Sequence, residues 1–204
     1  LFRSRSYTLD GEPILEDLDY TVTGLTEGTV PRDGNITVTV PGRDSIYSMN
    51  LYLEYPDAEG NMTSHGWGMS STEGQYSMTL SMMEVPAGST CKLYLTVWMV
   101  GYTSTVKIDL VTFTVTDFSE NMTLEPESGI RYSVPKNVLI HESFDIRVFS
   151  ENADMVGYEI ADAEGNIWRS ESTWNSSAVF TFEVEEANEY TVRVWAQSDW
   201  EDET

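Results

Sequence analysis

The amino-acid sequence predicts an all-β protein built from two tandem antiparallel β-sandwiches. Three observations predict this fold class: apolar and polar residues alternate almost throughout, turn residues interrupt these runs, and a long block of the chain occurs twice. The 204 residues suffice for two domains, each with a hydrophobic core of its own. We expect domain one to span residues 1–117 and domain two to span residues 118–204.

The internal repeat is centred on an identical pentapeptide, D-A-E-G-N, which occupies residues 57–61 and again residues 162–166. Alternating runs on either side of the pentapeptide recur in the same order. The paired runs are 36–40 with 144–148, 51–55 with 156–160, 76–82 with 178–184, and 93–98 with 190–195. Strand-like segments that recur in one order indicate two homologous domains.

Domain one contains alternating runs for seven strands, and their short lengths are typical of an antiparallel sandwich. The expected strands lie near residues 20–25, 35–40, 49–55, 61–67, 75–82, 92–100 and 104–116. In the last run the apolar residues occupy even positions up to Leu110 and odd positions from Val111. Such a change of phase within one strand predicts a β-bulge.

Domain two contains runs for six strands, and a counterpart of residues 104–116 is missing from the sequence. The expected strands lie near residues 130–134, 143–149, 155–161, 166–171, 177–184 and 189–196. We therefore expect domain two to lack its last strand here and the natural protein to continue beyond Thr204. The alternation lapses over residues 117–126, which we interpret as the junction between the domains.

The D-x-x-G-N turns and the late Y-x-V-x-V run at residues 190–194 resemble those of bacterial immunoglobulin-like or fibronectin-III-like modules. The segment A-N-E-Y-T-V, residues 187–192, resembles the start of strand F in such modules, where Tyr190 would form a tyrosine corner. Leu93 is the aligned residue in domain one, which argues against a tyrosine corner there. The resemblance implies a modular protein on a cell surface or in the extracellular space, and it assigns no ligand.

The composition excludes several function classes. The chain has 34 acidic and 11 basic residues and a formal net charge of −23, of which −9 lies in residues 1–117 and −14 in residues 118–204. This charge repels phosphates, so we expect no nucleic-acid binding and no attraction to anionic membranes. No apolar run is long enough to span a bilayer, and we expect no membrane insertion. Acidity together with scarce lysine indicates an exported bacterial protein with a highly soluble surface.

The repeated D-A-E-G-N segments have two interpretations. Glycine in the fourth position suits a backbone with positive φ, and aspartate in the first position can accept hydrogen bonds from turn amides. A calcium loop is the alternative, but each segment offers only two carboxylates, fewer than such loops normally use. We therefore predict structural turns, with no metal site and no cofactor.

Four aromatic residues are the candidate ligand-binding residues: His65, Trp67, Trp168 and Trp174. When positions are counted from the shared turn, Met62 and Ile167 take the buried phase and these four take the outward phase. Exposed rings on a sandwich face can stack on sugar rings. The alternatives are that a neighbouring domain covers the rings, or that a bulge shifts their phase and turns them inward.

The sequence contains no recognisable catalytic motif. Its two histidines, His65 and His141, fall in different domains, and Cys91 has no activating base nearby in the sequence. We therefore predict no catalytic residues. The predicted function is a non-catalytic extracellular spacer, adhesion or interaction module of a larger exported bacterial protein. Its partners would be a protein or glycan ligand and adjacent domains of the same polypeptide. The alternative is a carbohydrate-binding accessory module of a secreted enzyme.

Overall fold

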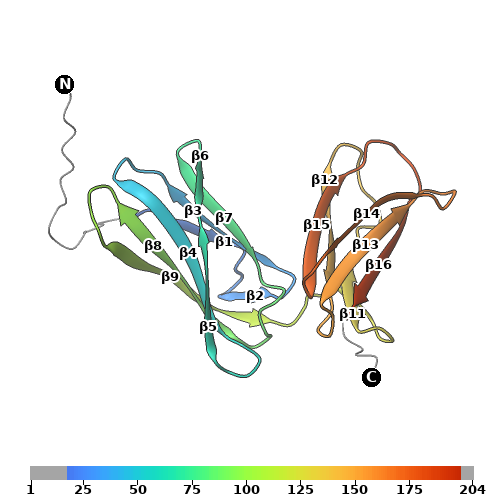
Figure 1. The fold of residues 1–204 in the computed structure, drawn as a ribbon, viewed down its shortest axis with the longest axis horizontal. Helices are drawn as coiled ribbons and strands as arrows, with labels where there is room; N and C mark the ends of the chain where they lie inside the picture. Colours follow the sequence, from blue (N-terminus) through green and yellow to red (C-terminus); the bar gives the residue numbers. More distant parts are fainter. Residues whose placement is uncertain (1–17, 199–204) are drawn as a thin grey trace, which may run out of the picture. The chain divides into compact units, whose positions relative to one another are not determined.

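The structure is a computed structural model, and it describes residues 18–198. All regular elements in this range are β-strands, numbered β1 to β16 (Figure 1). The all-β fold class is confirmed. The boundary between two compact units falls between Asp117 and Phe118. Within the described range no helix is long and apolar enough to cross a membrane.

Domain one is a sandwich of a four-stranded and a five-stranded sheet. The first sheet has the order β1 (Thr21–Thr23), β3 (Asn35–Pro41), β7 (Gln75–Ser81), β6 (Ser70–Thr72). The second has the order β2 (Thr29–Pro31), β9 (Thr105–Thr116), β8 (Thr90–Met99), β4 (Ile46–Pro56), β5 (Met62–Gly68). This is the immunoglobulin arrangement of strands A-B-E-D against G-F-C-C′. All seven predicted strands are present. The unpredicted β2 and β6 have three residues each, too few for a recognisable alternation.

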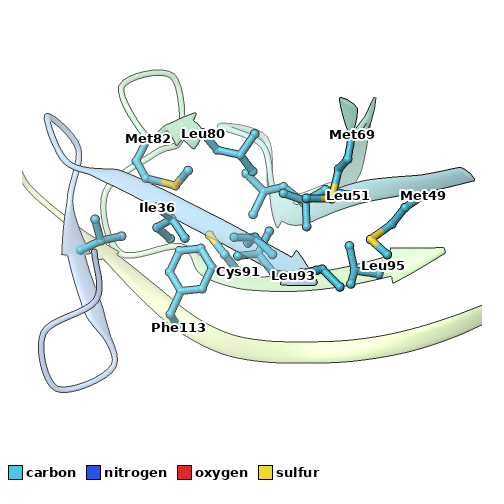
Figure 2. Close-up of a cluster of buried hydrophobic side chains, with 14 of the residues drawn as sticks. Ile36, Met49, Leu51, Met69, Leu80, Met82, Cys91, Leu93, Leu95 and Phe113 are labelled. Carbon is cyan, nitrogen blue, oxygen red and sulfur yellow. The ribbon is translucent and has the colours of Figure 1, made fainter. Parts of the chain in front are cut away.

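The core of domain one lies between these two sheets. Ile36, Val38 and Val40 point inward from alternate positions of β3 and are fully buried. They belong to one cluster with buried residues of the opposite sheet, among them Leu51 and Leu93 (Figure 2). The alternation that predicted these strands is therefore the alternation between the core and the outer face of each sheet.

The predicted β-bulge in the last strand of domain one is confirmed. Leu93 of β8 pairs with Val111 of β9, while the next residue, Tyr94, pairs with Asp109, so Leu110 has no partner on β8. The extra residue changes the phase of β9. The apolar residues on both sides of the bulge can therefore lie on the core-facing side of the sheet.

Domain two repeats the central strand pairings of domain one. One sheet has the order β10 (Thr123–Glu125), β11 (Ile130–Ser133), β12 (Ser143–Phe149), β15 (Ser177–Glu183). The other has the order β14 (Ile167–Thr173), β13 (Met155–Ala161), β16 (Thr191–Gln197). The pair β3–β7 of domain one recurs as β12–β15, and the trio β5-β4-β8 recurs as β14-β13-β16. The six predicted strands are all present, and β10 is a short additional one.

The predicted tyrosine corner of domain two is present. The Tyr190 hydroxyl donates a hydrogen bond to the backbone oxygen of Glu186 at 3.3 Å. The register corrects its alignment with domain one, however. Leu93 pairs with Leu53, and Val194 pairs with Tyr158, which lies 105 residues after Leu53. Leu93 therefore corresponds to Val194. The counterpart of Tyr190 is Ser89, four residues before the position expected from the sequence.

The two D-A-E-G-N segments form the same structural turn, as predicted. Asp57 Oδ1 accepts hydrogen bonds from the backbone amides of Glu59 at 2.9 Å and Asn61 at 2.8 Å. Gly60 has φ of 86°, a backbone conformation that favours glycine. In the second copy Asp162 Oδ1 accepts from the Asn166 amide at 2.8 Å. Each aspartate thus satisfies turn amides that would otherwise depend on water.

The second turn should make the stability of domain two depend on pH. Hydrogen bonds from Asn166, first from its side chain and then from its backbone, hold the pKa of Asp162 below its ordinary value of 3.8. The carboxylate therefore stabilises the fold above about pH 4, and this contribution is lost as pH falls through the lower pKa of the folded state. Asp162→Ala should reduce the urea midpoint of domain two at neutral pH and have a smaller effect at acidic pH. If the difference in urea midpoint between the wild type and Asp162→Ala stays constant with pH, the prediction is contradicted. An equal effect of the control Glu164→Gln would also contradict it.

Candidate functional site

The candidate residues of domain one lie on β5, an edge strand of the larger sheet among the described residues. His65 pairs with Leu53, and Trp67 pairs with Leu51. Residues directly opposite each other in an antiparallel pair point to the same face. Because Leu51 and Leu53 are buried in the core, His65 and Trp67 also lie on the core-facing side of the sheet. The outward phase predicted for them was wrong, and so was the inward phase of Met62, which is 68% exposed.

His65 and Trp67 remain accessible because they stand at the edge of the sandwich, where the opposite sheet does not fully cover them. Trp67 is 38% exposed. The His65 ring stacks on Trp67 with centroids 6.0 Å apart and on Tyr55 with centroids 5.7 Å apart. Burial raises the pKa of Tyr55, and the nearby Glu84 carboxylate raises it further. The three rings form a continuous aromatic row along the edge of domain one.

Trp168 of domain two owes its position to a β-bulge in β14. Ala161 pairs with Ile167 and Ile160 pairs with Arg169, so Trp168 is the extra residue between them. The inward phase predicted for Ile167 was wrong, since its side chain is 61% exposed. A bulge does change the phase of β14 at Trp168, as one of the alternatives allowed, but it does not bury the ring. The ring is 45% exposed and packs against Tyr190 with centroids 5.5 Å apart. We call this pair the Trp168–Tyr190 site.

The Trp168–Tyr190 site borders two hollows of different character. One, of about 190 Å³, has a mixed lining; besides the two rings it includes Phe144, Ile160 and Phe182 together with Lys136, Asn137 and Asn188. The other, of about 240 Å³, is polar; besides the two rings it is lined by Asp162, Glu185, Glu186 and Asn188. The site therefore combines exposed aromatic rings with carboxylate and amide groups that can bind hydroxyl or amine groups of a ligand.

Both rings are held in place before any ligand arrives. The corner hydrogen bond from Tyr190 to Glu186 fixes one ring, and the bulge fixes the backbone that carries the other. Rigid positioning lowers the ordering cost of binding. This feature could not be found from the sequence, because the site combines the residue before β16 with a bulge on β14, and these two strands flank β13.

The other candidates lie elsewhere. Trp174 follows the end of β14 and is 65% exposed, and it lines neither hollow of the Trp168–Tyr190 site. Cys91 is buried, and burial raises the pKa of its thiol to about 11, so the thiol is protonated at neutral pH. His141 Nδ1 lies 3.3 Å from Glu183 Oε1 in an exposed pair. Residues 18–198 contain no group of three or more His, Cys, Asp or Glu side chains arranged to hold a metal ion.

Comparisons with known proteins add little to this description. No protein-family model matches the sequence, and no curated protein matches it. Among solved structures, the chain is similar to the human OSCAR ligand-binding domain, at 11% sequence identity and a TM-score of 0.27. The match covers 87% of this chain and 97% of that one. A similarity of this size carries no argument about function. The order of the strands is what identifies the two domains as immunoglobulin-like sandwiches.

Proposed function

We propose that this chain is a non-catalytic, extracellular adhesion or interaction module of a larger exported bacterial protein. Its two sandwiches act as a spacer, and the Trp168–Tyr190 site of domain two makes the contact with a ligand. One observation carries this proposal: two aromatic rings are accessible and fixed in position beside a polar hollow. Large aromatic side chains that remain exposed next to a concave surface are typical of binding sites.

A second candidate function is supported by the lining of the polar hollow. A sugar ring needs an aromatic face for its C–H groups and carboxylate or amide oxygens for its hydroxyls. The rings of Trp168 and Tyr190 supply the first, and the acidic residues with Asn188 supply the second. The site therefore also suits a carbohydrate-binding accessory module of a secreted enzyme, with a neutral or cationic sugar favoured by the surrounding carboxylates.

Replacing Trp168 by alanine should remove the larger of the two rings of the site and weaken ligand binding by at least about 10-fold. We would screen the chain on a glycan array and on a panel of extracellular proteins, then titrate each binder while recording tryptophan fluorescence. Trp174→Ala is the matched control, because it removes an exposed tryptophan of the same domain outside the site. Trp174→Ala should leave ligand binding unchanged.

The screen separates the two candidates. A glycan ligand whose binding depends on Trp168 supports the carbohydrate-binding module, and a protein ligand with the same dependence supports the interaction module. If binding is equally strong in Trp168→Ala and lost in Trp67→Ala, the ligand site lies on the aromatic row of domain one. That outcome would contradict the assignment to domain two.

A further inference from the structure

The polar hollow beside the Trp168–Tyr190 site has a lining that favours positive charge in a ligand. Among the described residues its lining includes three carboxylates and one amide but no basic side chain. Lys136 lines the mixed hollow and not this one. The charge of the whole domain acts in the same direction, because residues 118–204 carry a net charge of −14.

Two of the three carboxylates are free to bind a ligand. Asp162 is occupied, since its carboxylate accepts hydrogen bonds from the backbone amide and the side chain of Asn166 in the turn. The carboxylates of Glu185 and Glu186 are exposed and make no hydrogen bond or ion pair with another residue in the range 18–198. A ligand that carries hydrogen-bond donors can therefore bind these two carboxylates without displacing a contact of the protein.

The two rings of the site also favour a cation. Trp168 and Tyr190 pack with their planes 38° apart, and the face of an aromatic ring attracts a cation that lies within about 6 Å of its centroid. Tryptophan gives the strongest attraction of this kind. Ring faces and free carboxylates thus line the same hollow, and both kinds of group favour a positively charged ligand group.

Domain two already contains one cation held by this combination of groups. The guanidinium of Arg169 lies 5.3 Å from the centroid of the Phe182 ring, and its Nη2 atom is 3.9 Å from a carboxylate oxygen of Glu171. A guanidinium is planar and weakly hydrated, so its face can stack on a ring while its edge donates hydrogen bonds to carboxylates. An ammonium is compact and strongly hydrated and is less suited to stacking. A neutral hydroxyl forms weaker hydrogen bonds to carboxylates than a cationic donor does.

We propose that the polar hollow binds an arginine side chain of a protein partner. The guanidinium stacks on the Trp168 ring and donates hydrogen bonds to the carboxylates of Glu185 and Glu186. This inference rests on the proposed function, because it names the ligand group that the same site recognises, and it favours the interaction module over the carbohydrate-binding module. Arginine is also among the residues that most often supply the binding energy of protein interfaces.

The test uses a short peptide as the probe, acetyl-Gly-Arg-Gly-amide. It is titrated into the full chain while the NMR signals of the Trp168 indole and of neighbouring amides are recorded. A second peptide carries citrulline, which has the shape of arginine without its charge, and a third carries lysine. The arginine peptide should shift the Trp168 signal, and the citrulline peptide should bind at least about 10-fold more weakly. The lysine peptide should have an intermediate affinity, and added salt should weaken the binding of both charged peptides.

The chain offers a matched control for the carboxylates. Glu185→Gln and Glu186→Gln should each weaken the arginine peptide by about 3-fold or more and leave the citrulline peptide unchanged. Glu189→Gln removes the same charge from the same segment, but Glu189 does not line the polar hollow. This control should therefore have little effect. If all three substitutions weaken the arginine peptide equally, the peptide responds only to the net charge of the domain, and the proposal is overturned.

Other outcomes separate this inference from the proposed function. Equal affinities of the arginine and citrulline peptides, or tighter binding of the lysine peptide, would overturn the choice of a guanidinium. If no peptide shifts the Trp168 signal at millimolar concentration while a glycan binds in a Trp168-dependent way, the inference fails and the ligand site of domain two stands. If no ligand of any class depends on Trp168, the proposed site and the inference fail together.

Discussion

Phe113→Ala is expected to lower the free energy of unfolding of domain one by about 3–5 kcal/mol. The ring is buried on β9 opposite Cys91 and points into the core between the two sheets (Figure 2). Its removal loses the transfer free energy of the ring and leaves a cavity that the sheets cannot fully close. A loss of this size is a large fraction of the stability of an ordinary domain.

Urea unfolding followed by two-dimensional NMR measures this effect for each domain separately. The midpoint of domain one should fall, while residues of domain two should unfold at their wild-type midpoint. Thr112→Ala is a suitable control, because Thr112 is exposed on the same strand and its loss should cost at most about 1 kcal/mol. If Phe113→Ala and Thr112→Ala have equal effects, Phe113 is not the core residue described above.

Substitutions of Tyr158 should have comparably large effects on the stability of domain two. Removing the ring should destabilise the domain, whereas removing only the hydroxyl should stabilise it. The ring of Tyr158 is fully buried and packs on Phe180 and Phe182, with centroids 4.8 Å and 5.4 Å away. Tyr158→Ala should therefore cost about 3–5 kcal/mol. The hydroxyl is buried and makes no hydrogen bond of normal distance and angle, although Arg169 and Glu171 lie close enough to act on its pKa in opposite directions. Tyr158→Phe should accordingly stabilise domain two, by about 1 kcal/mol, because it removes an unsatisfied polar group.

Tyr190→Phe provides the matched comparison, because it removes a hydroxyl that does donate a hydrogen bond, to the Glu186 backbone. It should destabilise domain two by about 1 kcal/mol. Thermal and urea unfolding of the variants give both signs in one series. A loss of stability in Tyr158→Phe would mean that its hydroxyl is hydrogen-bonded in solution.

Local features of the chain were predicted well, because they depend on neighbouring residues. The aspartate and glycine of each D-A-E-G-N segment form the expected turn, and the phase change at Leu110 marks the bulge in β9. The tyrosine corner at Tyr190 was recognised from a short motif. In each case the structure follows from the side chains of a few consecutive residues.

The faces of the edge strands were predicted wrongly, and the reason is the two-residue period of a β-strand. An alternating run fits equally well after a shift of two or four residues, which is why Tyr190 was aligned with Leu93 instead of Ser89. A single bulge exchanges the two faces. Met62 and Ile167 are apolar and therefore seemed inward, yet both lie on edge strands where an apolar residue can remain exposed.

The sequence alone determined the number and order of the main strands, the repeat and the acidic surface. Alternation, turn residues and charge depend only on which residues are close together in the sequence. The tertiary structure decided which strands are edges, which face each tryptophan takes, and that Trp168 meets Tyr190 across β13. These properties depend on pairings between distant segments, and a pattern of period two does not specify the register of such pairings.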